Sequence, residues 1–210
     1  MFTIQLVNKS ARPDVTIPWL LSVAAAVTEQ LQSFCADYGL AIWEVVTEPT
    51  PGAFLMNVSD VSTAPGAEGY HDDAGDLPEG FAFMLGTLDD GSVTISHECC
   101  ELVRDQDASG FRLSDSGIAY ADEACDAVED RTYKASNGVL LSDYVLPNWY
   151  VDGSKGPWDK LNVLTAPFSQ TTGGYTIQLA DGKVQTQPPS ARLAPKKADP
   201  RSRTSRRLSA

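Results

Sequence analysis

Two histidines and a group of acidic residues are the side chains of this sequence best suited to chemistry. His97 opens the run His97-Glu98-Cys99-Cys100-Glu101, and a spacing of four residues places His97 and Glu101 on one face of a helix. An imidazole nitrogen and a carboxylate oxygen at that spacing can share one metal ion. Glu98 would lie about 100° round the helix, where its carboxylate can act as general base on a metal-bound water. The run predicts a metal site with zinc as the expected ion, and the carboxylate ligand leaves Mg²⁺, Mn²⁺ and Ca²⁺ open.

The third ligand of such a site is expected from an acidic segment further along the chain, because catalytic zinc usually takes three protein ligands. Glu123, Asp126 and Glu129 stand there among apolar residues, which indicates that one side of the segment is buried. Buried carboxylates need a metal, a proton or a partner. We predict Glu129 as the third ligand, Asp126 as the second choice, and Glu123 as a residue supporting the ligands. The alternative is that all these acids are solvated charges without a metal.

His71 is the other histidine, and it lies in the run Gly69-Tyr70-His71-Asp72. A glycine-rich segment with carboxylates beside the imidazole is typical of a capped or ion-paired histidine. We therefore predict a structural role for His71, with the orientation of a metal ligand as the alternative.

The elements that must position these residues mix helices and strands without regular alternation, which favours an α+β fold. Apolar spacing predicts helices over 18–38 and 97–104, with a strand-like approach at Thr94 and Ile95, and a helix or tight loop over 121–130. Strands are expected at 2–8, 41–47, 81–87 and 139–147, with a turn at 89–91, a polar loop at 105–117 and a hairpin over 175–182. No two cysteines have the Cys-x-x-Cys spacing of a structural zinc site, so reduced, buried thiols are expected at Cys35, Cys99, Cys100 and Cys125.

Charge is divided unevenly along the 210 residues. Residues 1–190 hold 9 basic and 27 acidic side chains, whereas residues 191–210 hold 7 basic side chains and one acidic side chain. We expect a domain over 1–190 and a basic, extended or disordered tail over 191–210, which would contact an acidic neighbour such as another copy of this chain. The acidic body argues against nucleic acid as a partner. No stretch reaches the length of a membrane span and the start does not resemble a signal peptide, so we expect a protein that stays in the cytoplasm where it is made.

Five blocks stand in order between residues 69 and 176: Gly69-Tyr70-His71-Asp72, Ser96-His97-Glu98-Cys99-Cys100-Glu101-Leu102, Glu123-Ala124-Cys125-Asp126-Ala127-Val128-Glu129, Ser142-Asp143-Tyr144-Val145-Leu146-Pro147-Asn148-Trp149-Tyr150, and Pro167-Phe168 with Gly173-Gly174-Tyr175. Together they resemble the zincin-like metallopeptidase-type proteins of tailed bacteriophages. The resemblance implies a zincin-like domain, in which a mixed sheet supports an active-site helix carrying His-Glu-x-x-Glu, on a phage-encoded protein that travels in the virion. It leaves two functions open, a metal-dependent peptidase with Glu98 as its base, and a non-catalytic structural or assembly protein of the head, connector or tail. The expected partners are other virion proteins or copies of this chain, with no membrane involved.

Overall fold

The computed structural model describes residues 1–64, 66–73 and 75–188. These residues contain two α-helices, eleven β-strands and two 3-10 helices. This mixture confirms the predicted α+β class. The predicted tail over 191–210 lies outside the described residues. The strands are β1 (Phe2–Asn8), β2 (Trp43–Val46), β3 (Phe54–Ser59), β4 (Gly69–Asp72), β5 (Glu79–Phe83), β6 (Phe111–Leu113), β7 (Ala119–Ala121), β8 (Thr132–Lys134), β9 (Leu140–Ser142), β10 (Thr176–Ala180) and β11 (Lys183–Gln187). The helices are α1 (Ile17–Tyr38), α2 (Leu88–Arg104), and the 3-10 turns η1 (Asp126–Val128) and η2 (Pro147–Tyr150).

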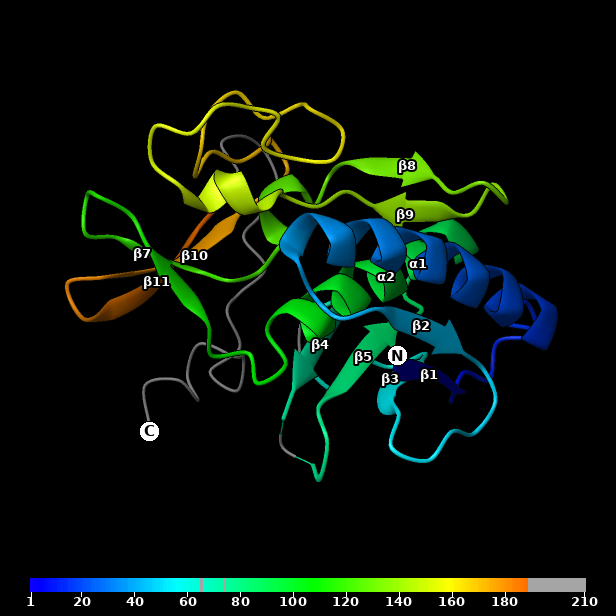
Figure 1. Cartoon of the computed structure of the whole chain (residues 1–210). Helices are drawn as coiled ribbons and strands as arrows, with labels where there is room; N and C mark the ends of the chain where they lie inside the picture. The colour runs from blue at the N-terminus through cyan, green and yellow to red at the C-terminus, as the bar shows by residue number, and fades with distance from the viewer. Residues whose placement is uncertain (65, 74, 189–210) are drawn as a thin grey trace.

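A five-stranded mixed sheet forms one layer, in the order β2-β1-β3-β5-β4. The first four strands run parallel, and β4 pairs with β5 in the antiparallel direction at the edge. The two helices lie together on this sheet, and α2 contacts both β5 and β4 (Figure 1). Register pairs His71 of β4 with Gly80 of β5, which places His71 beside the second helix.

Helix α1 forms where the sequence predicts it because both of its ends are capped. The side chain of Thr16 accepts a hydrogen bond from the backbone N–H of Trp19, and Gly39 ends the helix in the left-handed region at φ 64°. Only glycine adopts that conformation without steric cost. The apolar face buries residues such as Val27 and Phe34 completely, which fixes the helix on the sheet.

Helix α2 begins nine residues before the predicted start, so the turn predicted at 89–91 and the strand-like approach predicted at Thr94 and Ile95 are wrong. The physical reason is a capping box: the Thr87 side chain accepts from the backbone of Asp90, and the Asp90 side chain accepts from the backbone of Thr87. The acidic first turn also favours the positive end of the helix dipole. As a result the predicted strand over 81–87 is shorter, and β5 ends at Phe83.

The remaining strands form a four-stranded sheet and a two-stranded hairpin. Strands β10 and β11 form the predicted hairpin and join β7 and β6 in an antiparallel sheet, so part of the loop predicted at 105–117 is strand β6. The β8–β9 hairpin packs on α2, and β9 is the short strand found within the predicted range 139–147. All four cysteines are free and buried, as predicted. No described helix combines the length and the apolar character needed to cross a membrane.

The buried carboxyl group of Asp143 is expected to make the free energy of unfolding depend on pH. Burial and the neighbouring charge of Asp159 raise the pKa of Asp143 to about 8, and Asp143 is completely buried. Between pH 4 and pH 8 the folded chain therefore holds a proton that the unfolded chain releases, so the free energy of unfolding falls as the pH rises. Asp143→Asn removes this titration, and at pH 7 we expect the variant to be more stable than wild type by about 2–4 kcal/mol.

Urea unfolding at a series of pH values from 4 to 8 measures this effect. The difference between the two proteins should be smallest near pH 4, where the carboxyl is protonated in both states. Curves that run parallel from pH 5 to pH 8 would show that Asp143 is ionised in the folded chain.

Candidate metal centre

His97 and Glu101 lie one helical turn apart on α2 and face the same interior space. Nε2 of His97 is 3.2 Å from Oε1 of Glu101. The same Oε1 accepts a hydrogen bond of 3.2 Å from the backbone N–H of Cys125, which ties the helix to the segment that precedes η1. His97 is 8% exposed and Glu101 is fully buried. The polar motif of α2 thus points into the protein.

Asp126 approaches the same histidine from η1. Its Oδ1 is 3.3 Å from Nε2 of His97, and its Oδ2 has no hydrogen-bond partner among the described residues although Asp126 is only 2% exposed. The backbone holds η1 in place, because the carbonyl of Asp126 accepts from Tyr175 N–H and the carbonyl of Ala127 accepts from Thr171 N–H. Gly174 allows the close approach, since a Cβ there would meet the Ala127 carbonyl oxygen at 2.2 Å.

The three donor atoms fit a small divalent cation. They lie within 4.8 Å of one another, and the two measured separations from the His97 nitrogen are 3.2 Å and 3.3 Å. Ligand atoms bound to tetrahedral zinc at about 2.0–2.1 Å are separated by about 3.3 Å. One imidazole with two carboxylates is a donor set that zinc accepts, and the unsatisfied oxygen of buried Asp126 is the group that a cation would pair.

The pKa shifts of His97 and Glu101 show that the buried group favours a positive charge between its carboxylates. Burial opposes the charge on His97, but Glu101 and Asp126 outweigh it and raise the pKa of His97 well above its usual value. Burial raises the pKa of Glu101 to about 7; the charge of His97 lowers it, and the charges of Asp126 and Glu123 raise it further. Metal binding must displace protons from both side chains, so metal affinity should weaken as the pH falls below neutrality.

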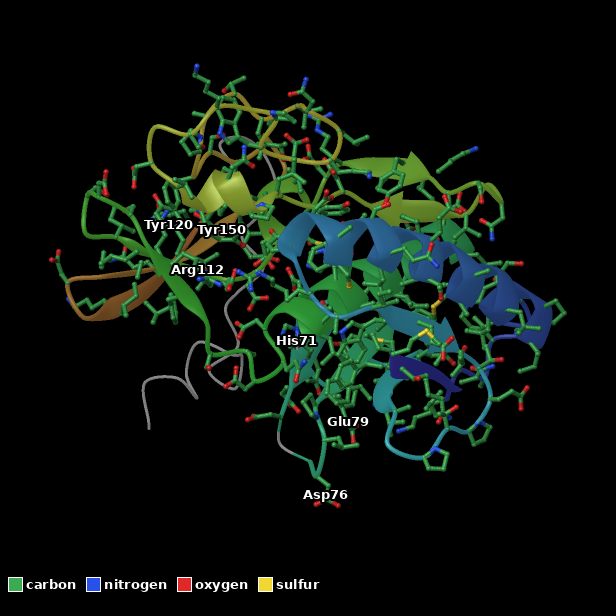
Figure 2. All side chains as sticks on the ribbon, in the orientation of Figure 1. His71, Asp76, Glu79, Arg112, Tyr120 and Tyr150 are labelled. Carbon is green, nitrogen blue, oxygen red and sulfur yellow. The ribbon has the colours of Figure 1, made fainter. Side chains whose placement is uncertain are left out.

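Glu98 and His71 form a second contact beside this group. Nδ1 of His71 is 3.6 Å from Oε2 of Glu98, and both side chains are buried. Gly69 permits the contact, because a Cβ at this position of β4 would lie 2.7 Å from Cγ of Glu98 and 2.8 Å from Cγ2 of Thr94. Figure 2 shows His71 on β4 close to the helices, whereas Asp76, in the loop between β4 and β5, points outward.

The acidic segment separates into residues that reach the site and residues that do not. Asp126 reaches His97, and Glu123 lies within ligand distance of Glu101 and His71. Glu129, the first choice from sequence, is half-buried where η1 ends and belongs to neither ligand group found among the described residues. The geometry therefore favours Asp126 over Glu129, because the tertiary contacts of η1 turn Asp126 inward. Asp122 instead pairs with Arg104 at 2.8 Å.

The side chains of this group are almost closed to solvent. The five acids and histidines around Glu101, which are His71, His97, Glu98, Glu123 and Asp126, are all at most 8% exposed. A cavity of about 650 Å³ at the C-terminal end of α2 is lined by Arg104 and Asp105 among others, and none of these five residues lines it. His97 is the most exposed of the set.

Comparison of the chain with protein-family models, with curated proteins and with solved structures finds no match. Function is therefore inferred from the residues and geometry described above.

Proposed function

We propose that this protein binds a zinc ion through His97, Glu101 and Asp126. The observation that carries the proposal is the pair of separations from Nε2 of His97, 3.2 Å to Glu101 and 3.3 Å to Asp126, in a buried setting. Other divalent ions that accept oxygen ligands, such as Mn²⁺, compete for the same donor set. The geometry supports Asp126 as the third ligand.

The reaction that fits this centre best is metal-assisted hydrolysis of a peptide bond in a zincin-like domain. The ion would polarise the carbonyl and lower the pKa of a bound water. Glu98 follows His97 directly on α2, and we assign it the proton transfer from that water; its Oε2 lies 3.6 Å from Nδ1 of His71. The mixed sheet beside the motif helix is the arrangement that the resemblance to zincin-like proteins implies, and the edge strand β4 offers backbone groups to an extended peptide.

We also propose that the protein is a virion component of a tailed bacteriophage, made in the host cytoplasm. The support is the run of five blocks between residues 69 and 176 that resembles phage proteins. The same proposal accounts for the opposite charges of the acidic residues 1–190 and the basic residues 191–210, because assembly brings copies of the chain or other virion proteins into contact.

Burial favours a second candidate function, a metal that only stabilises a non-catalytic virion protein. Structural zinc sites are closed, whereas catalytic sites keep a position open for water and substrate. All the side chains proposed as ligands are at least nine-tenths buried, which fits the closed class.

Metal analysis of the purified full-length chain, followed by a peptide-hydrolysis assay, tests these functions. We expect bound zinc after dialysis against metal-free buffer, and a chelator should remove both the metal and any cleavage. Zinc without cleavage of a peptide library or of virion proteins would favour the structural role. A chain that takes up no divalent ion at neutral pH would contradict both roles of the metal.

We expect removal of residues 191–210 to weaken the association of the chain with its partners in a salt-dependent way. Those residues carry 7 of the 16 basic side chains, and the remaining chain is strongly acidic. We expect the truncated chain to self-associate, or to bind a virion partner, at least about tenfold more weakly at low salt, with the difference shrinking near 0.5 M salt as charges are screened. Sedimentation of both proteins at two salt concentrations measures this, and a truncation that instead unfolds the domain would contradict it.

A further inference from the structure

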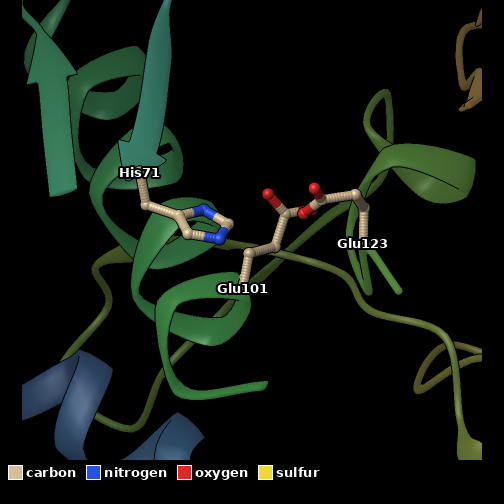
Figure 3. A group of neighbouring side chains, drawn as sticks. All are labelled: His71, Glu101 and Glu123. Atoms are coloured by element: carbon tan, nitrogen blue, oxygen red, sulfur yellow. The ribbon is translucent and has the colours of Figure 1, made fainter. Parts of the chain in front are cut away.

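A second group of ligand atoms shares Glu101 with the first. His71 from β4, Glu101 from α2 and Glu123 from the loop before η1 each offer one atom, and these atoms lie within 4.8 Å of one another. Figure 3 shows the imidazole and the two carboxylates converging from these three elements. His71 and Glu101 are fully buried and Glu123 is 3% exposed. Glu101 therefore stands between the two histidines.

The ring of His71 is oriented as a metal-binding histidine would be. Its Nε2 lies 2.8 Å from the backbone carbonyl oxygen of Asp105, and because a carbonyl only accepts, Nε2 carries the hydrogen. This leaves Nδ1 to face the carboxylates, with Oε2 of Glu98 at 3.6 Å. Histidines that bind metals commonly donate their other N–H to a backbone carbonyl, which fixes the tautomer and the direction of the ring.

The fully ionised cluster carries enough negative charge to balance two divalent ions. Four buried carboxylates, those of Glu98, Glu101, Glu123 and Asp126, surround two imidazoles within this region of the fold. If all four are ionised and both imidazoles are neutral, one divalent ion leaves two negative charges buried, and two ions leave none. Uncompensated buried charge is strongly unfavourable.

We propose that the cluster holds a second divalent cation between His71, Glu101 and Glu123, with the Glu101 carboxylate bridging the two ions. The inference depends on the proposed function because Glu101 is shared with the ion at His97. Two nearby cations would coordinate both the attacking water and the substrate oxygen, which is how two-metal hydrolases stabilise the negative charge that develops in the transition state. One nitrogen with two carboxylate oxygens also accepts Mn²⁺, so the second position takes zinc or manganese.

The stoichiometry of bound zinc tests this proposal directly. Full-length wild type, His71→Gln, Glu123→Gln and His97→Ala are equilibrated with excess ZnCl₂ at pH 7.5, passed over a desalting column and analysed for zinc per chain. We expect two ions in wild type and one in each variant. Asp143→Asn is the matched control, since it replaces a buried carboxyl group outside the cluster and should keep two ions. Circular dichroism confirms folding, and the two substitutions at the second position keep the test valid if one of them fails to fold.

Spin coupling between two bound Mn²⁺ ions tests independently whether the Glu101 carboxylate bridges them. Wild type loaded with Mn²⁺ should show the electron paramagnetic resonance of a coupled pair, and His71→Gln should show that of an isolated ion. One zinc per chain that is lost in His97→Ala but retained in His71→Gln would overturn the second position and leave the proposed function intact; His71 would then be an imidazolium paired with Glu98. A single ion lost in both variants would also overturn it. No zinc in wild type would overturn the proposed function as well.

Discussion

Replacing His97 by alanine is expected to weaken zinc binding at its site by more than about 100-fold, because the substitution removes the one nitrogen donor that Glu101 and Asp126 share. The loss should exceed the 10- to 100-fold that removal of a supporting hydrogen bond typically costs, since a ligand itself is lost. Competition with a chromophoric zinc chelator at pH 7.5 measures the affinity of each protein.

Asp126 and Glu129 provide the matched comparison for this prediction. Asp126→Ala should weaken zinc binding in the same way, because its carboxylate is 3.3 Å from the histidine nitrogen. Glu129→Ala should bind zinc as wild type does, since Glu129 is half-buried at the end of η1. Wild-type affinity in Asp126→Ala together with a loss in Glu129→Ala would show that the third ligand is Glu129 and that η1 turns differently.

Glu98→Gln is expected to lower peptide hydrolysis by about 1,000-fold while the protein keeps its zinc. The amide has the size of the carboxylate but cannot take a proton from water, so the chemical step loses its base. The carboxylate lies among buried side chains, 3.6 Å from Nδ1 of His71, where glutamine fits without a change of volume. The assay compares kcat for a cleaved peptide in the two proteins, with zinc content measured on the same samples.

The outcome of this substitution separates the two functions proposed above. Loss of turnover with retained metal supports the peptidase and the role of Glu98 in proton transfer. Turnover that survives in Glu98→Gln would assign the base elsewhere. If wild type itself holds zinc but cleaves nothing, the ion stabilises the fold, and removal of zinc should then lower the melting temperature without any change in hydrolysis.

Local chemistry allowed part of the fold to be predicted. Helix α1 was predictable because its apolar spacing and both of its caps lie within the segment itself. The same holds for the β10–β11 hairpin, whose turn at Asp181-Gly182 needs only neighbouring residues. The early start of α2 was also encoded locally, in the reciprocal caps of Thr87 and Asp90, but the acidic dipeptide with Gly91 resembles a turn. Strand β4 was not predictable, because four residues in a glycine-rich stretch become a strand only by pairing with β5.

The candidate site divides in the same way. The shared helix face of His97 and Glu101 was predictable from their spacing, because residues four apart in a helix lie on the same face. Long-range folding instead selected which acid of the later segment joins them, because the orientation of a three-residue helix depends on backbone hydrogen bonds from Thr171 and Tyr175, more than 40 residues away in sequence. It also decided that His71 faces the other side of Glu101, since that contact requires β4 to pair at the edge of the sheet and pack against α2. Side chains from separate segments converge through long-range pairing and burial, and neither is encoded in the spacing of residues within one segment.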